Sequence, residues 1–233
     1  MKAIILVGGF GARLRSVLPD IPKPMAPIGD KPFLAHLLHY LQQQGITHVI
    51  FSVHYLKEKI QTYFQSHYAG ISIDYAEEDE PLGTGGAMVN ALSMIKTNEP
   101  IFILNGDTFV KLDYQLMYKE HVKNAGKLTI ALRSVNDCSR YGKVICEKNI
   151  ITTFKEKGEI GPGFINAGVY LIHPDLFSAY HLPAQFSFER DFLFPHLFIL
   201  KPQAFHADNY FIDIGMPADY ARAQKELPGI KER

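Results

Sequence analysis

The first 24 residues constrain the fold of this chain more than any other segment, because a strand-like run leads directly into a glycine-rich loop. Residues 4–7 are all aliphatic, a pattern typical of a fully buried strand. Gly8, Gly9 and Gly11 follow at once, and glycine lets the backbone adopt positive φ and approach a ligand closely. Successive N–H groups in such a loop form a concavity that binds anions. The start of the chain therefore predicts an anion-binding loop at the end of a buried strand.

Two basic side chains strengthen this prediction. Arg13 lies two residues after Gly11, and Lys23 lies between Pro22 and Pro24. Proline disfavours the α region for the residue before it, so Lys23 is expected in an extended segment. The glycines alone fit an ordinary strand-to-helix turn equally well, whereas glycines together with two fixed positive charges favour a polyphosphate site.

Two widespread phosphate-binding motifs do not match. A Walker A loop requires Gly, four residues and then Gly-Lys-Ser/Thr, and the sequence contains no such string. A dinucleotide fingerprint requires a third small residue after its second glycine and an acidic residue about 20 positions further on. Here Leu14 stands at the third small position, and the expected strand at residues 48–53 ends in His54. These differences argue against the hypothesis that the chain is a dinucleotide-dependent oxidoreductase.

Hydrophobic periodicity alternates between strands and helices along the rest of the chain. Apolar runs predict strands at residues 3–7, 48–53, 72–77 and 101–105. Helical spacing predicts helices at residues 33–44, 56–67 and 86–95, and shorter strands follow at 128–133, 142–145 and 167–172. Strands separated by helices are typical of βαβ units. We therefore predict an α/β, three-layer Rossmann-like fold with a mixed, mainly parallel central sheet, in a single domain of residues 1–233.

Composition excludes several classes of partner. The chain has 24 basic and 24 acidic residues, so no basic excess points to nucleic acid. No apolar run approaches the roughly 18 residues that a membrane helix needs. Cys138 and Cys146 form no disulfide framework, and the ten histidines show no zinc-binding spacing. We expect a cytoplasmic protein that binds neither nucleic acid nor membrane.

Two aspartates are candidate metal ligands. Asp107 follows the expected strand at 101–105 immediately, and Asp213 lies between two isoleucines in an alternating strand pattern. Each has an ordinary alternative, because Asp often caps a turn or faces solvent from a strand. Mg²⁺ usually takes one or two carboxylates together with phosphate oxygens. The pair therefore favours Mg²⁺ more than either residue alone.

Seven motifs in order resemble the sugar-1-phosphate nucleotidylyltransferases, enzymes that join a nucleoside triphosphate and a sugar 1-phosphate into a nucleotide sugar. GGFGARL followed by PKPM forms the first motif, near the N-terminus. The others are LGTGGA (82–87), LNGDTF (104–109), RYGKV (140–144), FKEK (154–157), NAGVY (166–170) and FIDIGMPADY (211–220). The resemblance covers nearly the whole chain and implies the nucleotidyltransferase variant of the predicted fold.

The resemblance also implies that the two halves of the chain bind different substrates. Residues 1–112 would hold the nucleotide, through Leu6, Gly8, Gly9, Gly11, Arg13, Glu77, Gly83, Thr84, Gly106 and Asp107. Residues 113–233 would hold the sugar phosphate, through Tyr141, Gly142, Glu156, Lys157, Asn166 and Gly168. The matching catalytic set is Arg13, Lys23, Asp107 and Asp213, with Mg²⁺ on the two aspartates as the only expected cofactor. Gly158 departs from the proline usual after the FKEK motif.

Substrate identity is less constrained. Glu77 or Glu78 could accept the N–H groups of guanine, although an acidic run is often merely solvated. Within the family, the resemblance favours GTP and a manno-configured heptose 1-phosphate. The alternatives are UTP or dTTP with another sugar 1-phosphate (N-acetylmuramate, glucose or mannose), and a non-catalytic subunit that binds a nucleotide sugar. A homo-oligomer is possible.

Overall fold

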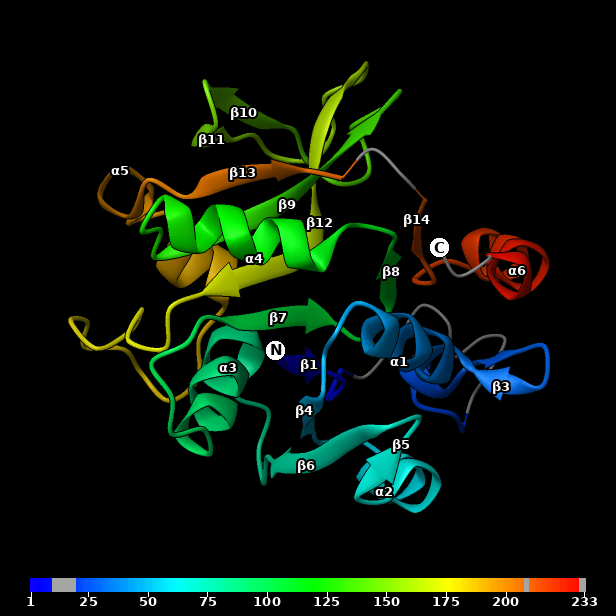
Figure 1. Cartoon of the computed structure of the whole chain (residues 1–233). Coiled ribbons are helices and arrows are strands. Elements are labelled where there is room, and N and C mark those ends of the chain that lie inside the picture. Colours follow the sequence, from blue (N-terminus) through cyan, green and yellow to red (C-terminus); the bar gives the residue numbers. More distant parts are fainter. Residues whose placement is uncertain (10–19, 208–209, 231–233) are drawn as a thin grey trace.

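The computed structural model describes residues 1–9, 20–207 and 210–230, and in this part of the chain helices cover both faces of one large twisted sheet (Figure 1). The sheet has ten strands in the order β10-β11-β13-β9-β12-β7-β1-β4-β6-β5. In that order they are Val144–Glu147, Ile150–Phe154, Gln203–His206, Leu128–Val135, Gly163–Ile172, Ile101–Asn105, Lys2–Leu6, His48–Val53, Ile71–Glu77 and His67–Tyr68.

The sheet is mixed, as predicted. Strands β7, β1, β4 and β6 are mutually parallel, and β13 runs parallel to β9. The remaining neighbours are antiparallel, including β12 against both β7 and β9. The mainly parallel character therefore holds for the first half of the chain, whereas the second half adds mostly antiparallel strands.

Helices lie on both faces of the sheet. They are α1 (Phe33–Gln43), α2 (Lys57–Phe64), α3 (Gly83–Ser93), α4 (Tyr114–Lys123), α5 (Leu197–Leu200) and α6 (Pro217–Glu226), with shorter turns η1 (Lys23–Met25), η2 (Phe188–Leu193) and η3 (Leu227–Gly229). One apolar core packs α1, α2, α4 and α6 against one face, and a second packs α3 and η2 against the other. Alternate residues of β1 enter opposite cores: Ala3 and Ile5 enter the first, and Ile4 the second. These are the three predicted layers.

Helix α3 begins at Gly83, three residues before the predicted start. Its glycines lie inside the helix because the segment at 184–186 packs directly against them. A Cβ on Gly85 would lie 2.1 Å from Cε2 of Phe186, and one on Gly86 would lie 2.2 Å from the carbonyl oxygen of Ala184. Close packing, which the sequence pattern does not reveal, therefore explains these glycines.

Two small sheets complete the structure. Strands β2 (Pro27–Ile28) and β3 (Lys31–Pro32) form a hairpin. Strand β8 (Thr108–Val110) follows β7 and pairs antiparallel with β14 (Phe211–Asp213), so Asp213 lies opposite Thr108. The Ile214 amide then donates to the Asp107 carbonyl at 3.0 Å. Among the described helices, none is long and apolar enough to cross a membrane.

Candidate active site

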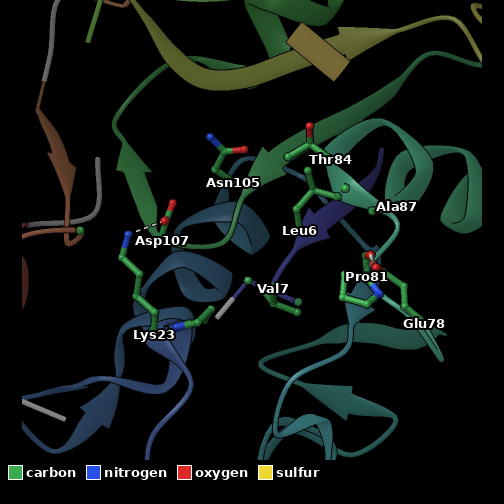
Figure 2. A pocket seen from close by; sticks show the side chains of 15 residues that line it. Leu6, Val7, Lys23, Glu78, Pro81, Thr84, Ala87, Asn105 and Asp107 are labelled. Atoms are coloured by element: carbon green, nitrogen blue, oxygen red, sulfur yellow. Dashed lines mark hydrogen bonds and ion pairs between the residues drawn. The ribbon is translucent and has the colours of Figure 1, made fainter. Parts of the chain in front are cut away.

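A cavity of about 540 Å³ opens at the carboxyl ends of β1, β4 and β7. Figure 2 shows Lys23 and Asp107 on one side of this cavity and Glu78 and Pro81 on the other, with Leu6 between them. Its full lining is Leu6, Val7, Gly8, Gly9, Lys23, Pro24, Ser52, Glu78, Pro81, Gly83, Thr84, Ala87, Asn105, Asp107 and Gly215. Ligands of open α/β sheets bind at this edge of the strands, so the cavity lies where the predicted fold requires it.

Most of the residues predicted to bind the nucleotide meet in this cavity. Leu6, Gly8, Gly9, Gly83, Thr84 and Asp107 all line it. Gly106 lies directly beneath, where its amide donates to the Leu6 carbonyl at 2.9 Å and a Cβ would come within 2.5 Å of Val7 Cγ1. Gly11 and Arg13 lie outside the described residues.

The side chain of Lys23 bridges two carboxylates at one end of the cavity. Its ammonium group pairs with Asp107 Oδ2 and lies 3.4 Å from Asp213 Oδ1. The Gly215 amide donates to the same Asp213 oxygen at 2.7 Å, and the Thr108 hydroxyl donates to Asp107 Oδ1 at 3.1 Å. The two aspartates are distant in sequence and adjacent in space because β8 pairs with β14.

These two carboxylates fit a hard divalent cation. Among the described residues, no group of three or more His, Cys, Asp or Glu side chains gathers where a metal could bind. Two carboxylates without further protein ligands are the arrangement that Mg²⁺ uses when it completes its octahedron with waters and phosphate oxygens. The Lys23 ammonium already between them shows that this point attracts positive charge.

The neighbouring glutamates Glu77 and Glu78 have different surroundings. Glu77 is half exposed, pairs with Lys57 at 2.6 Å and accepts from Gln61, and these contacts lower the pKa of its carboxyl. Glu78 is buried and lines the cavity. Its Oε1 accepts from the Ser52 hydroxyl at 2.6 Å and its Oε2 from the Leu82 amide at 3.0 Å. Of the two glutamates considered for the base, Glu78 lines the cavity, whereas Glu77, the one included in the predicted nucleotide site, does not.

Several lining residues were not predicted from the sequence. Ser52 and Asn105 lie at or next to the carboxyl ends of β4 and β7, and Gly215 follows Asp213 in the FIDIG motif. The position of Ser52 and Asn105 at strand ends is a signal that could have found them. Ala87 ends the LGTGGA motif and lies in helix α3, whereas nothing in the local sequence marks Pro81 as a cavity residue.

One residue predicted for the sugar phosphate, Gly168, adjoins the cavity residue Asn105, and a second, Asn166, is hydrogen-bonded to Gly168. Gly168 has φ +73°, and a Cβ there would lie 2.7 Å from Asn105 Nδ2. Asn166 accepts from the Gly168 amide at 3.0 Å and donates to Glu189 at 2.6 Å. Glu189 was not predicted, and it joins Asn166 to the buried hydroxyl of Tyr170, which donates to it at 2.9 Å.

The other four lie on neighbouring loops outside the cavity lining. Tyr141 is half-buried, and its ring packs edge-on against Phe211, with the ring centroids 5.9 Å apart. Gly142 has φ +82°, and a Cβ there would lie 2.6 Å from the carbonyl oxygen of Lys155. Glu156 and Lys157 follow in that same segment and are exposed. The structure therefore brings these four residues together as one group, and their contact with a sugar phosphate stays a prediction.

Comparison with known proteins identifies the class. Residues 2–229 match the model of the nucleotidyl transferase family, and the chain belongs to that family. The fold, with its cavity at the strand ends, is that of a nucleotidyltransferase enzyme.

Within this family, the chain is similar to enzymes of one particular specificity. The chain is 49% identical over 227 residues to the D-glycero-alpha-D-manno-heptose 1-phosphate guanylyltransferase of Aneurinibacillus thermoaerophilus, covering 97% of this chain and 98% of that one. Identity to the enzyme of the same name from Campylobacter jejuni is 47%, covering 94% and 97%. Among solved structures, HddC from Yersinia pseudotuberculosis superimposes with a TM-score of 0.87 and 38% identity, covering 97% of this chain and 99% of that chain, and it was also solved in complex with GMP-PN.

Proposed function

We propose that this enzyme transfers the guanylyl group of GTP to D-glycero-α-D-manno-heptose 1-phosphate, giving GDP-heptose and pyrophosphate. The observation that carries the proposal is the distribution of charged side chains between the two ends of the cavity. Lys23 and two aspartates occupy one end, where phosphates belong, and the buried Glu78 carboxylate occupies the other, where a base belongs. The similarity to guanylyltransferases of this specificity supports the same assignment.

The reaction requires no nucleophile from the protein. A phosphate oxygen of the sugar 1-phosphate attacks the α-phosphorus of GTP, and the bond from that phosphorus to the bridging oxygen breaks as pyrophosphate leaves in line. Catalysis then consists of positioning and charge stabilisation. In our proposal the amides of Gly8 and Gly9, with Gly11 and Arg13 of the same motif, hold the β- and γ-phosphates. Lys23 neutralises charge near the α-phosphate.

Asp107 and Asp213 are the residues that would hold Mg²⁺. Bound there, the ion would supply Lewis-acid polarisation of the phosphate oxygens. The chain itself contributes the approach of the two carboxylates, which the β8–β14 pairing sets. The Gly215 amide and the Thr108 hydroxyl orient one oxygen of each.

Selection of guanine follows from the chemistry of Glu78. A carboxylate can accept both the N1–H and the N2–H of guanine, and uracil and thymine offer no such pair of donors. Each oxygen of Glu78 has one protein donor, from Ser52 or Leu82, and keeps acceptor capacity for a ligand. With the wrong base this buried carboxylate would lose its ligand partners, a penalty that can discriminate strongly.

The sugar phosphate would bind in the second half of the chain, residues 113–233. We assign Tyr141, Gly142, Glu156, Lys157, Asn166 and Gly168 to this subsite. Glu156 suits paired sugar hydroxyls and Lys157 suits the phosphate. Both side chains are exposed, which leaves them accessible to a substrate. A cytoplasmic location and a possible homo-oligomer belong to the same proposal.

Steady-state kinetics across GTP, UTP, dTTP and CTP, each with several sugar 1-phosphates, tests the proposal by pyrophosphate release. We expect the highest kcat/KM for GTP with the heptose 1-phosphate, ahead of mannose and glucose 1-phosphate. A preference for UTP or dTTP would refute the guanylyl assignment while leaving a nucleotidyltransferase. Nucleotide-sugar binding without turnover of any pair would favour a regulatory subunit.

A further inference from the structure

One ion pair joins the loop at Tyr141 to the segment that carries Asp213. Nη2 of Arg140 donates to Asp219 Oδ2 at 2.6 Å. Asp219 lies in the first turn of α6, and its side chain is only 10% exposed, whereas that of Arg140 is 51% exposed. The pair therefore anchors an accessible arginine to a nearly buried carboxylate, an arrangement more strongly constrained than an ordinary surface ion pair.

The ring of Tyr141 is held within the same cluster. The Arg140 guanidinium lies over this ring, 5.2 Å from its centroid, and the ring meets Phe211 edge-on at 80°. Phe211 is the first residue of β14, two positions before Asp213. Arg222 of α6 donates to the Phe211 carbonyl at 3.0 Å, which ties the helix to the strand. The loop thus contacts strand and helix together.

This contact links the loop assigned to the sugar phosphate with the strand that carries a candidate metal ligand. Tyr141 and Gly142 are assigned to the sugar phosphate, and Asp213 is one of the two carboxylates beside Lys23. The loop itself is closed by local hydrogen bonds, because the amides of Tyr141 and Gly142 both donate to the Cys138 carbonyl, at 3.0 and 3.1 Å. Those bonds shape the loop, and the Arg140–Asp219 pair is its charged connection to β14 and α6.

We propose that Arg140 and Asp219 are positioning residues for the sugar phosphate: their ion pair holds the Tyr141–Gly142 loop at a set place relative to Asp213. The proposal rests on the function assigned above. Neither residue lines the cavity, so they act through Tyr141 and Gly142 rather than by touching substrate. Reactions that depend on positioning are sensitive to shifts of about 1 Å, which makes such an anchor consequential.

Kinetics of Arg140→Gln, Arg140→Lys and Asp219→Asn separate this role from a general structural one. We expect Arg140→Gln and Asp219→Asn to raise KM for the sugar phosphate about tenfold while KM for GTP changes less than about twofold. Arg140→Lys should recover part of the loss. Arg140→Gln removes the shorter of the two ion pairs of the nearly buried Asp219, which also lies 3.7 Å from Arg222 Nη1. The double variant with Asp219→Asn is therefore included, because it removes the charge of both partners. We expect it to be no worse than either single variant, since residues of one pair couple.

Lys127→Gln is the matched control, because Lys127 pairs with Asp175 at 2.6 Å in the same half of the chain. That pair lies where β9 begins and β12 has ended, away from the cavity, and its loss should leave both KM values unchanged. Equal increases in both KM values in a folded variant, or additive effects in the double variant, would overturn the proposal.

Amide hydrogen exchange provides a readout that does not depend on turnover. In the free protein, Arg140→Gln and the double variant should exchange the Tyr141 and Gly142 amides faster than wild type, and Lys127→Gln should not. Unchanged exchange at these amides refutes the anchoring role. If the wild-type protein turns over no triphosphate with any sugar phosphate, the proposed function is wrong. Amide exchange at Tyr141 and Gly142 still shows whether the Arg140–Asp219 ion pair anchors the loop.

Discussion

Replacing Glu78 by Gln is expected to weaken the preference for GTP. Gln keeps one acceptor oxygen but turns an NH₂ group toward the second N–H of guanine, so one charge-assisted hydrogen bond is lost and the other is weakened. A hydrogen bond to a charged group is worth about 1.5–3 kcal/mol, which corresponds to about 10- to 150-fold in kcat/KM. We expect a loss of this size for GTP and little change for UTP.

The adjacent residue supplies the control. Glu77→Gln removes the same charge one position earlier, but its side chain pairs with Lys57 outside the cavity, so kcat/KM for both triphosphates should stay at the wild-type value. Glu78 also accepts from Ser52 and Leu82, so thermal unfolding must first show that Glu78→Gln is folded. A folded Glu78→Gln enzyme with an unchanged ratio of kcat/KM for GTP and UTP would refute base recognition by this carboxylate.

Three further predictions concern the aspartate pair, the packing of helix α3 and a buried histidine. Asp107→Asn and Asp213→Asn should each lower kcat by orders of magnitude without loss of fold, and excess EDTA should abolish pyrophosphate release; full turnover in either case contradicts the metal assignment. Gly85→Ala should lower the free energy of unfolding by about 1–3 kcal/mol in urea, because its Cβ would lie 2.1 Å from the Phe186 ring; an unchanged midpoint argues against that packing. Burial lowers the pKa of His121 from 6.5 to about 4, so the unfolded chain takes up a proton at this residue before the native protein does. Between pH 6.5 and 4 this residue alone should lower the free energy of unfolding by about 1.4 kcal/mol for each pH unit of acidification. Urea titrations should therefore show a steeper slope against pH in wild type than in His121→Gln, and equal slopes would exclude this contribution.

Local chemistry made the cavity at the strand ends predictable. Gly8 and Gly9 follow an aliphatic strand directly, and the strand end, the loop and its charge are set within one short stretch of chain. In parallel sheets such ends gather at one edge, so Asp107 could be placed beside them before any contact was known. The three-layer architecture followed from the alternation of strands and helices for the same reason.

The second half was less predictable because its pairings are antiparallel and nonlocal. Strand β12 begins at Gly163, four residues before the predicted start, since its first residues pair with the end of β9. The helix predicted at residues 86–95 did not include Gly83 and Gly85, because only the segment at 184–186 reveals why they lie inside α3. Asn166 and Gly168 were identified by motif, but the close approach of Gly168 to Asn105 depends on the β12–β7 pairing.

By itself the sequence determined the glycine loop at a strand end, the lysine between prolines and the two aspartates, and from these it predicted phosphate binding and a divalent cation. Only the tertiary structure decided which groups meet. Asp107 and Asp213 converge because β8 pairs with β14, and the sequence pattern of neither strand encodes that distance. The choice between Glu77 and Glu78 also depends on the fold, because β6 ends at Glu77, which pairs with Lys57, and the next residue, Glu78, lines the cavity.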